Sequence, residues 1–275
     1  MTRAGIVVAA IALAGCSYFK SAEPAPGGAV TPVPGKAAPK PSSARLTSGA
    51  ALVRAMHDLY SGQYLKTMSF LQNNTAYTTT GQEQHSQWYE HIEAPGKLRI
   101  AFLPASQRSG LVQVDDKVAS FDNGIRVDFR PSVNPLLVLT SDIYAAPVTQ
   151  IMRELDSLQV DTDLIRTDEW NGRPVYVVGA KAGDTTSNQM WVDADRLLLV
   201  RFIQRSKAGD RTIISDNRVQ NYKEIQGYQI PTEFLVIRNG RPVWREQYAN
   251  VRINEDFPAG TFDQARWHDI PIPEP

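Results

Sequence analysis

The sequence predicts a mainly β protein, an antiparallel barrel or deep half-barrel of about 11 strands, with an N-terminal helix and a second helix inserted midway that can cover an apolar cavity. Three observations lead to this fold class. From residue 64 onward, apolar and polar residues alternate with a period of two in many short segments. Turn sequences join these segments, such as Asn-Gly at 123–124, 171–172 and 239–240. Two stretches, 47–62 and 147–160, instead have the 3.6-residue period of an amphipathic helix.

The first residues are typical of a secretory signal. Arg3 precedes the apolar run Ile6 to Leu13, which is far shorter than the roughly 20 residues of a membrane span. The next residues complete the sequence Leu-Ala-Gly-Cys at 13–16, which resembles the lipobox of bacterial lipoproteins. This resemblance implies cleavage before Cys16 and attachment of lipid to it, so that residues 1–15 are a lipoprotein signal peptide. The alternative is an ordinary signal peptide with a chance cysteine.

Residues 16–45 are expected to hold the lipidated cysteine and a linker. This segment is rich in Pro, Ala and Gly and cannot bury a core. Positions 1–45 contain five of the 29 basic residues and one of the 29 acidic residues, which leaves residues 46–275 with a net charge of −4. That charge argues against nucleic-acid binding. We expect residues 46–275 to form one domain, because no second linker interrupts them.

The domain is predicted to begin with a helix. Thr47 or Ser48 can cap it, and Ser61-Gly62 can end it. Five apolar residues form one stripe on this helix: Leu52, Val53, Met56, Leu59 and Tyr60. The strands that follow are expected at 64–79, 84–93, 98–102, 109–122 and 125–130.

A break at Pro131 precedes the predicted lid. The sequence from Asn134 to Leu139 leads to a helix that Pro147 opens, because the first helical turn tolerates a missing N–H. Further strands are expected at 162–168, 173–181, 188–192, 197–205, 211–224, 227–238 and 241–254, followed by a Pro-rich tail over the surface. Two amphipathic helices can cover the concave face of such a curved sheet.

A barrel with this many strands has room for a ligand, so we assign candidate ligand-binding residues to an apolar cavity. Strand parity selects the following residues of the sheet: Met68, Phe70, Trp88, Leu98, Ile100, Phe102, Ile125, Val127, Phe129 and Trp191. The lid is expected to contribute Leu136, Leu139, Ile151 and Met152. The alternative for each of them is ordinary core packing.

The sequence offers no pattern for catalysis, for a cofactor or for a metal. None of the four histidines has a His or Cys neighbour at metal-ligand spacing. A nucleophile elbow, a Gly-rich phosphate loop and the H-E-x-x-H motif are all missing from the sequence. A hydrolase whose triad assembles from distant positions remains a third hypothesis, because triads are defined by geometry.

Five stretches resemble the LolA/LolB lipoprotein-carrier superfamily, in the order of that family. They are 88–102 with Ala-Pro-Gly-Lys-Leu-Arg-Ile at 94–100, 112–121, 134–139, Trp-Val-Asp-Ala-Asp-Arg-Leu-Leu-Leu-Val-Arg at 191–201, and 250–263. From the first to the last, these stretches extend over most of residues 48–265. Ala94 departs from the family pattern, in which an arginine at this place is attributed to a lid latch. Ser17 is not the aspartate that is associated with retention in the inner membrane.

The resemblance implies an unclosed antiparallel β-barrel with a lid helix over an apolar cavity that takes acyl chains, and it implies no catalysis. The expected protein is a lipoprotein anchored in the outer membrane and facing the periplasm, where it binds lipid or lipoprotein acyl chains in envelope trafficking. Its expected partners are the membrane, a lipid or acylated protein as ligand, and an envelope protein. The alternative is a protein-interaction sensor or assembly module with the same fold and no lipid transfer.

Overall fold

The computed structural model describes residues 46–272, and the predicted signal peptide, Cys16 and linker lie outside this range. Strands dominate the described chain, as the sequence predicts. The strands are β1 (Thr67–Tyr77), β2 (Glu83–Glu93), β3 (Lys97–Phe102), β4 (Gly110–Val114), β5 (Lys117–Asp122), β6 (Ile125–Pro131), β7 (Ile165–Trp170), β8 (Arg173–Val178), β9 (Gln189–Asp193), β10 (Leu199–Ala208), β11 (Arg211–Ile225), β12 (Tyr228–Arg238) and β13 (Arg241–Ile253). The helical elements are α1 (Gly49–Tyr60), η1 (Ala105–Gln107), α2 (Pro135–Leu137), η2 (Val138–Asp142), α3 (Ile143–Ala145), α4 (Val148–Ser157) and η3 (Gln264–Arg266).

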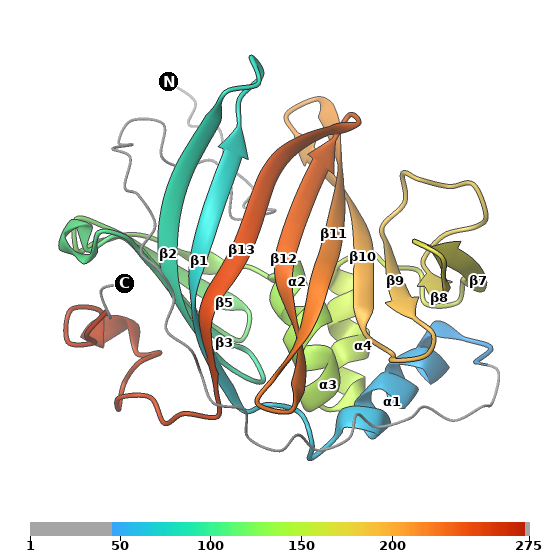
Figure 1. Ribbon diagram of the computed structural model, residues 1–275, viewed down its shortest axis with the longest axis horizontal. Coiled ribbons are helices and arrows are strands. Elements are labelled where there is room, and N and C mark those ends of the chain that lie inside the picture. Colours follow the sequence, from blue (N-terminus) through green and yellow to red (C-terminus); the bar gives the residue numbers. More distant parts are fainter. Residues whose placement is uncertain (1–45, 273–275) are drawn as a thin grey trace.

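Within residues 46–272, thirteen strands form a single antiparallel sheet in the order β6-β5-β4-β3-β2-β1-β13-β12-β11-β10-β9-β8-β7. The first strand pairs with the last one, β1 with β13, in the middle of the sheet (Figure 1). Strands β6 and β7 are the two edges and do not pair with each other, so the barrel is unclosed. This confirms the predicted fold class, with two more strands than the expected eleven.

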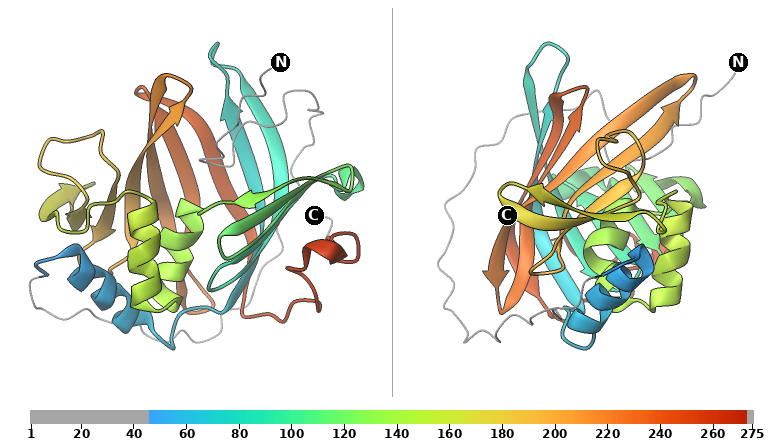
Figure 2. Two further views of the ribbon diagram at one scale, coloured as in Figure 1. Left: turned by 180° about the vertical axis from the view of Figure 1, so that it is seen from behind. Right: turned by 90° about the vertical axis from the view of Figure 1, so that its right-hand side faces the viewer.

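The helices lie on one side of the sheet, within its curve (Figure 2). The segment from α2 to α4 connects the edge strand β6 to the other edge strand β7, so it crosses the concave face from one edge to the other. Helix α1 packs against α3 and α4 in the same layer. Within the described residues, no helix is long and apolar enough to cross a membrane.

Helix α1 forms where the sequence predicts it. The hydroxyl of Ser48 accepts a hydrogen bond from the N–H of Ala51, which caps the first turn. Leu52, Val53 and Met56 are fully buried on the side that faces the sheet and the lid. This burial against the rest of the core, more than helix propensity, holds a helix of 12 residues in place.

The lid is a helical segment with two irregularities rather than one helix. The side chain of Asn134 caps it by accepting from the N–H groups of Leu136 and Leu137. A π-helical turn, η2, widens the backbone at Val138–Asp142. Pro147 then breaks the segment and starts α4, as its sequence position predicts.

The C-terminal tail differs from the expectation that it only runs over the surface. Trp267 is buried and stacks on Phe121, with their ring centroids 4.5 Å apart. The guanidinium of Arg99 lies 4.0 Å from the centre of the Trp267 ring and donates to its backbone oxygen at 2.9 Å. The tail is therefore part of the core on the convex face. Its Trp267 covers the guanidinium of Arg99, which is buried without a carboxylate partner among the described residues.

Candidate functional site

The concave face of the sheet is apolar where the helices cover it. One cluster joins the lid and α1 to the strands on the β7 side of the sheet. Its fully buried members include Ile143, Ile151 and Leu155 from the helical segment and Met190 and Val192 from β9. Helices and sheet thus bury a common apolar surface, and that burial supplies the main force that holds the lid closed.

A second apolar cluster on the same face lies towards β6 and is rich in aromatic rings. The ring centroid of Trp88 is 5.1 Å from that of Phe102 and 5.4 Å from that of Trp244. Leu98 and Ile100 from β3 complete this inner cluster, and the lid contributes Leu137 to it. The lid therefore contacts aromatic as well as aliphatic parts of the concave face.

Two glutamates sit on this face among the aromatic residues. Glu90 and Glu246 are 5% and 6% exposed. Burial, together with the charge of Glu246, raises the pKa of Glu90 well above its usual value. Burial raises the pKa of Glu246 to about 7, although hydrogen bonds from the indole of Trp244 and the hydroxyl of Tyr248 oppose this shift. The site therefore has two carboxyls that are hard to ionise while the face is closed.

Tyrosines fasten the helical layer to its surroundings. Tyr64 donates to the backbone oxygen of Thr140 in the lid, and the N–H of Leu199 in β10 donates to the hydroxyl of Tyr144 at 3.3 Å. Tyr60 donates to the backbone oxygen of Arg196 at 2.6 Å, and burial raises its pKa to about 12. These hydroxyls stay protonated at neutral pH, so they act as fixed hydrogen-bonding groups that position the lid.

One carboxyl of the lid binds the turn between β2 and β3. Asp142 is buried and accepts a hydrogen bond of 2.9 Å from the backbone N–H of Gly96. Burial raises the pKa of Asp142 to about 7, and the hydrogen bond from Gly96 opposes that shift. The sequence analysis assigned no residue to this contact.

The structure brings many of the predicted ligand-binding residues to the concave face. Trp88, Leu98, Ile100 and Phe102 meet in one cluster, and Phe70 stacks on Tyr248 with centroids 4.0 Å apart. The lid residues Leu136, Leu139, Ile151 and Met152 all pack in the cluster under the helices. Met68 lies apart from both groups, half-buried beside Leu65 and Ile253. Contact with a ligand stays a prediction for all of them.

Four predicted residues lie elsewhere, which corrects their assignment to an enclosed inner surface. Ile125, Val127 and Phe129 are 70%, 62% and 51% exposed on the edge strand β6. They alternate as core residues do, but among the described residues no second layer buries this face of β6. Trp191 lies on the convex face with Val175 and Val177, because Met190 and Val192 on either side of it face the helices.

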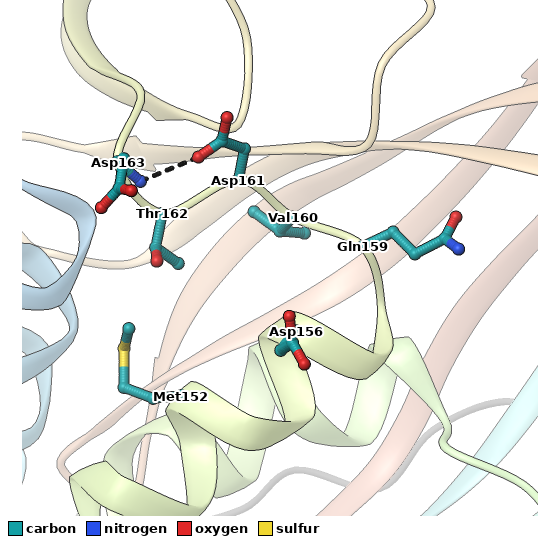
Figure 3. A pocket seen from close by; sticks show the side chains of 7 residues that line it. All are labelled: Met152, Asp156, Gln159, Val160, Asp161, Thr162 and Asp163. Carbon is teal, nitrogen blue, oxygen red and sulfur yellow. Dashed lines mark hydrogen bonds between the residues drawn. The ribbon is translucent and has the colours of Figure 1, made fainter.

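An open hollow of about 640 Å³ lies between the end of α4 and the loop that leads to β7 (Figure 3). Met152 and Val160 give it an apolar floor, while Asp156, Asp161 and Asp163 make its rim acidic. The carboxyl of Asp161 accepts from the N–H of Asp163 at 3.0 Å, which fixes the loop. Among the described residues, no group of three or more His, Cys, Asp or Glu is arranged to hold a metal.

Glu90, Glu246 and Asp142 are polar residues of the site that the sequence analysis missed. A signal for the two glutamates exists, because Trp88-Tyr89-Glu90 and Trp244-Arg245-Glu246 share the spacing Trp-x-Glu. In a strand this spacing places both side chains on one face, so an inward tryptophan implies an inward glutamate.

The solved structures that are similar to this chain include the following three. A LolA superfamily protein from Nitrosomonas europaea matches with a TM-score of 0.53 and 14% identity, over 79% of this chain and 98% of that one. A DUF1329 family protein from Desulfovibrio piger matches with a TM-score of 0.54 and 16% identity, over 80% of this chain and 98% of that one. An outer membrane lipoprotein-sorting protein domain from Vibrio parahaemolyticus matches with a TM-score of 0.55 and 8% identity, over 80% and 96%.

These likenesses show that the chain has a LolA-like fold, in agreement with the resemblance found in the sequence. No protein-family model matches the chain, and no curated protein does.

Proposed function

We propose that this protein is a lipoprotein of the cell envelope that binds the acyl chains of lipids or of other lipoproteins on its concave face. One observation carries the proposal: a helical lid links the two edges of an open sheet and covers an apolar, aromatic-rich surface. A sheet that only needed a core could be covered by a single straight helix. This lid is instead interrupted at η2 and at Pro147, so that its parts can separate.

The physical chemistry of the face suits an acyl chain. Each methylene group that leaves water contributes about 0.8 kcal/mol, so a chain gives large affinity without directional contacts. The candidate contacts are the inner-face residues Phe70, Trp88, Ile100 and Phe102, with Leu136, Leu139, Ile151 and Met152 from the lid. In this proposal the chain enters between lid and sheet as the lid moves away.

The proposed location is the periplasmic side of the outer membrane. It rests on the sequence at 13–16, on Ser17, and on the names of two structural neighbours, a LolA superfamily protein and a lipoprotein-sorting domain. In this proposal Cys16 carries the lipid, residues 16–45 form the linker between the membrane and the domain, and residues 46–275 are the binding domain. We propose binding and trafficking rather than an enzymatic reaction, because the sequence has no catalytic pattern.

The proposal is tested with the full chain carrying Cys16→Ser, so that its own lipid anchor does not confuse the measurement. Native mass spectrometry of the protein purified from cells should show co-purified lipid or acylated protein. The same protein should bind a fluorescent fatty acid, and unlabelled fatty acid should displace it. A protein that contains no lipid after purification and does not bind the fluorescent fatty acid would overturn the proposal.

A protein-interaction sensor or assembly module is the second candidate. The exposed apolar residues Ile125, Val127 and Phe129 on the open edge β6 favour it, because such an edge can pair with a strand of another protein. Crosslinking in cells from position 127 separates the two candidates. One dominant protein partner without bound lipid would favour the module, and bound lipid without a partner would favour the binder.

A further inference from the structure

Two strands of the concave face carry the same short pattern, on either side of β1. Trp88 and Glu90 point inward from β2, and Trp244 and Glu246 point inward from β13. In the sheet, Glu90 lies opposite Phe70 of β1, and Glu246 lies opposite Asn74 of the same strand. Phe70 stacks on Tyr248 with centroids 4.0 Å apart, and the hydroxyl of Tyr248 lies 3.5 Å from Glu246, so the same aromatic pair adjoins both glutamates. The pattern therefore creates one acidic place on the concave face.

Among residues 46–272, neither carboxyl has a cationic partner. Glu246 accepts from the indole N–H of Trp244 at 2.8 Å and lies 3.5 Å from the hydroxyl of Tyr248. Within residues 46–272, the side chain of Glu90 makes no hydrogen bond, and no lysine or arginine pairs with either glutamate. A buried carboxyl without such a partner is costly unless it stays protonated.

A third strand shows that this fold can supply the missing cation. Trp191-Val192-Asp193 has the same spacing on β9, and its carboxyl is also almost fully buried. Asp193 is paired with Arg173 at 2.7 Å and with Arg196 at 2.8 Å. Asp193 thus has cationic partners within the described chain, whereas Glu90 and Glu246 have none there. This contrast implies that the two glutamates are not ordinary buried carboxyls of the core.

The neighbours of the two glutamates have the chemistry of a cation site. The tryptophan rings of the two patterns are 5.4 Å apart, and Phe102 extends this aromatic group. The faces of aromatic rings attract ammonium groups, and the attraction is strongest for tryptophan. The donor Nδ2 of Asn74, opposite Glu246, is buried without a hydrogen-bond partner within the described residues, so this face also lacks a hydrogen-bond acceptor, which an oxygen next to the amine of a ligand would supply.

We propose that Glu90 and Glu246, with Trp88 and Trp244, form a subsite for a cationic ammonium headgroup, so that the preferred ligand is an apolar chain with a positively charged amine at its end. This inference rests on the proposed function, because it names the headgroup of the same acyl ligand. An ammonium headgroup favours the ionised form of the two carboxyls and can pair with it, whereas an anionic headgroup opposes their ionisation and gains no ion pair. A neutral headgroup would leave the carboxyls unpaired.

The test compares three ligands with the same twelve-carbon chain: dodecylammonium, dodecanol and dodecanoate. The full chain with Cys16→Ser is titrated at pH 8, below the concentrations at which these compounds form micelles, and binding is measured by displacement of a fluorescent fatty acid and by calorimetry. We expect dodecylammonium to bind at least about tenfold more tightly than either of the other two, a difference of about 1.4 kcal/mol.

Variants assign that preference to residues. Glu90→Gln and Glu246→Gln should each reduce the preference to less than about threefold, while Glu233→Gln should keep it. Glu233 is a suitable control because it is a buried glutamate on β12 that is already paired with Arg245 at 3.0 Å. Thermal unfolding checks that each variant is folded. If a variant does not fold, the comparison of the three ligands on the protein that keeps both glutamates still tests the proposal.

The outcomes separate the two proposals. If no twelve-carbon compound binds, the proposed function fails. If all three bind equally, or dodecanoate binds best, the acyl-binding function stands and the ammonium subsite is overturned. If the preference exists but survives both glutamine variants, it does not come from these carboxyls and the subsite is again overturned.

Discussion

The carboxyl of Asp142 in the lid accepts a hydrogen bond of 2.9 Å from the backbone N–H of Gly96 in the turn between β2 and β3. The family that the sequence resembles has an arginine, to which a lid latch is attributed, where this chain has Ala94 in this turn, so the sequence predicts that this latch is missing. Here the side chain belongs to the lid, and the turn supplies only its backbone N–H. The lid is thus fastened to this turn through Asp142, without that arginine.

The titration of Asp142 makes the stability of the protein depend on pH. The pKa of Asp142 is about 7 in the folded protein, above its ordinary value of 3.8, chiefly because of burial and further because of the charges of Glu154 and Asp115. The folded state therefore holds this proton to a higher pH than the unfolded state does. Its contribution to the free energy of unfolding is complete below about pH 4, declines as the pH rises, and is lost above about pH 7.

Asp142→Asn tests this prediction, because the amide still accepts from Gly96 but cannot ionise. We expect the variant to be more stable than the original protein at pH 8, by at most about 4 kcal/mol, and similar to it at pH 4. Urea unfolding at pH 4, 6 and 8 measures the difference. A difference in unfolding free energy that stays constant over these three pH values would contradict the prediction.

A pair of tryptophans separates ligand binding from stability. Trp88 on the concave face and Trp191 on the convex face are equally buried, at 8% and 7% exposed. Each change to alanine should lower the free energy of unfolding by about 3–5 kcal/mol, because each leaves a large cavity. Only Trp88→Ala should weaken the binding of a fluorescent fatty acid, by at least about tenfold. Equal losses of binding in both variants would mean that the inner face has no special role.

Arg201 is predicted to stabilise the convex face. Its guanidinium lies 4.4 Å from the ring of Trp170 and 4.7 Å from the ring of Trp191, and it donates twice to Asp216, at 2.6 and 3.1 Å. We expect Arg201→Ala to cost about 2–3 kcal/mol and Arg201→Lys to cost about half of that, because lysine keeps the charge but loses the planar fork.

Urea unfolding measures both changes, and Arg205→Ala is the matched control. Arg205 lies on the same strand but is exposed, so its loss should change the free energy of unfolding by less than about 0.5 kcal/mol. If lysine restored full stability at position 201, charge alone would explain the contact and the stacking on the two rings would be irrelevant.

The fold was largely predictable because its signals are local. The Asn123-Gly124 turn has both residues at positive φ, as a tight hairpin between β5 and β6 requires, and Ser48 caps α1 as expected. The face of the sheet on which a given side chain lies was less predictable. All five residues of β9 are buried, so alternation could not tell which face Trp191 takes.

The polar part of the site depends on contacts between distant residues. Asp142 and Gly96 are 46 positions apart, and no local pattern links an aspartate in a lid to a backbone N–H in a turn. Glu90 and Glu246 could have been assigned from their spacing to Trp88 and Trp244. Their lack of a cationic partner could not have been predicted, because it depends on which arginines the folded sheet places near them.

The edge strand β6 gives the last prediction. Ile125, Val127 and Phe129 are exposed on a strand whose outer edge pairs with no other strand of the described chain. Val127→Lys should therefore change the free energy of unfolding by less than about 0.5 kcal/mol, since the side chain is already in water. A charge on an open edge opposes pairing with another strand, so the same variant should lose any protein crosslinks that form at β6 in cells.

Urea unfolding and crosslinking from a photoreactive residue at position 129 check the two parts of this prediction separately. A stability loss above about 2 kcal/mol would mean that β6 is covered within the folded chain, as a core strand is. Crosslinks that persist in Val127→Lys would mean that a partner at this edge recognises something other than its apolar residues. Unchanged stability together with lost crosslinks is the result expected of a docking edge.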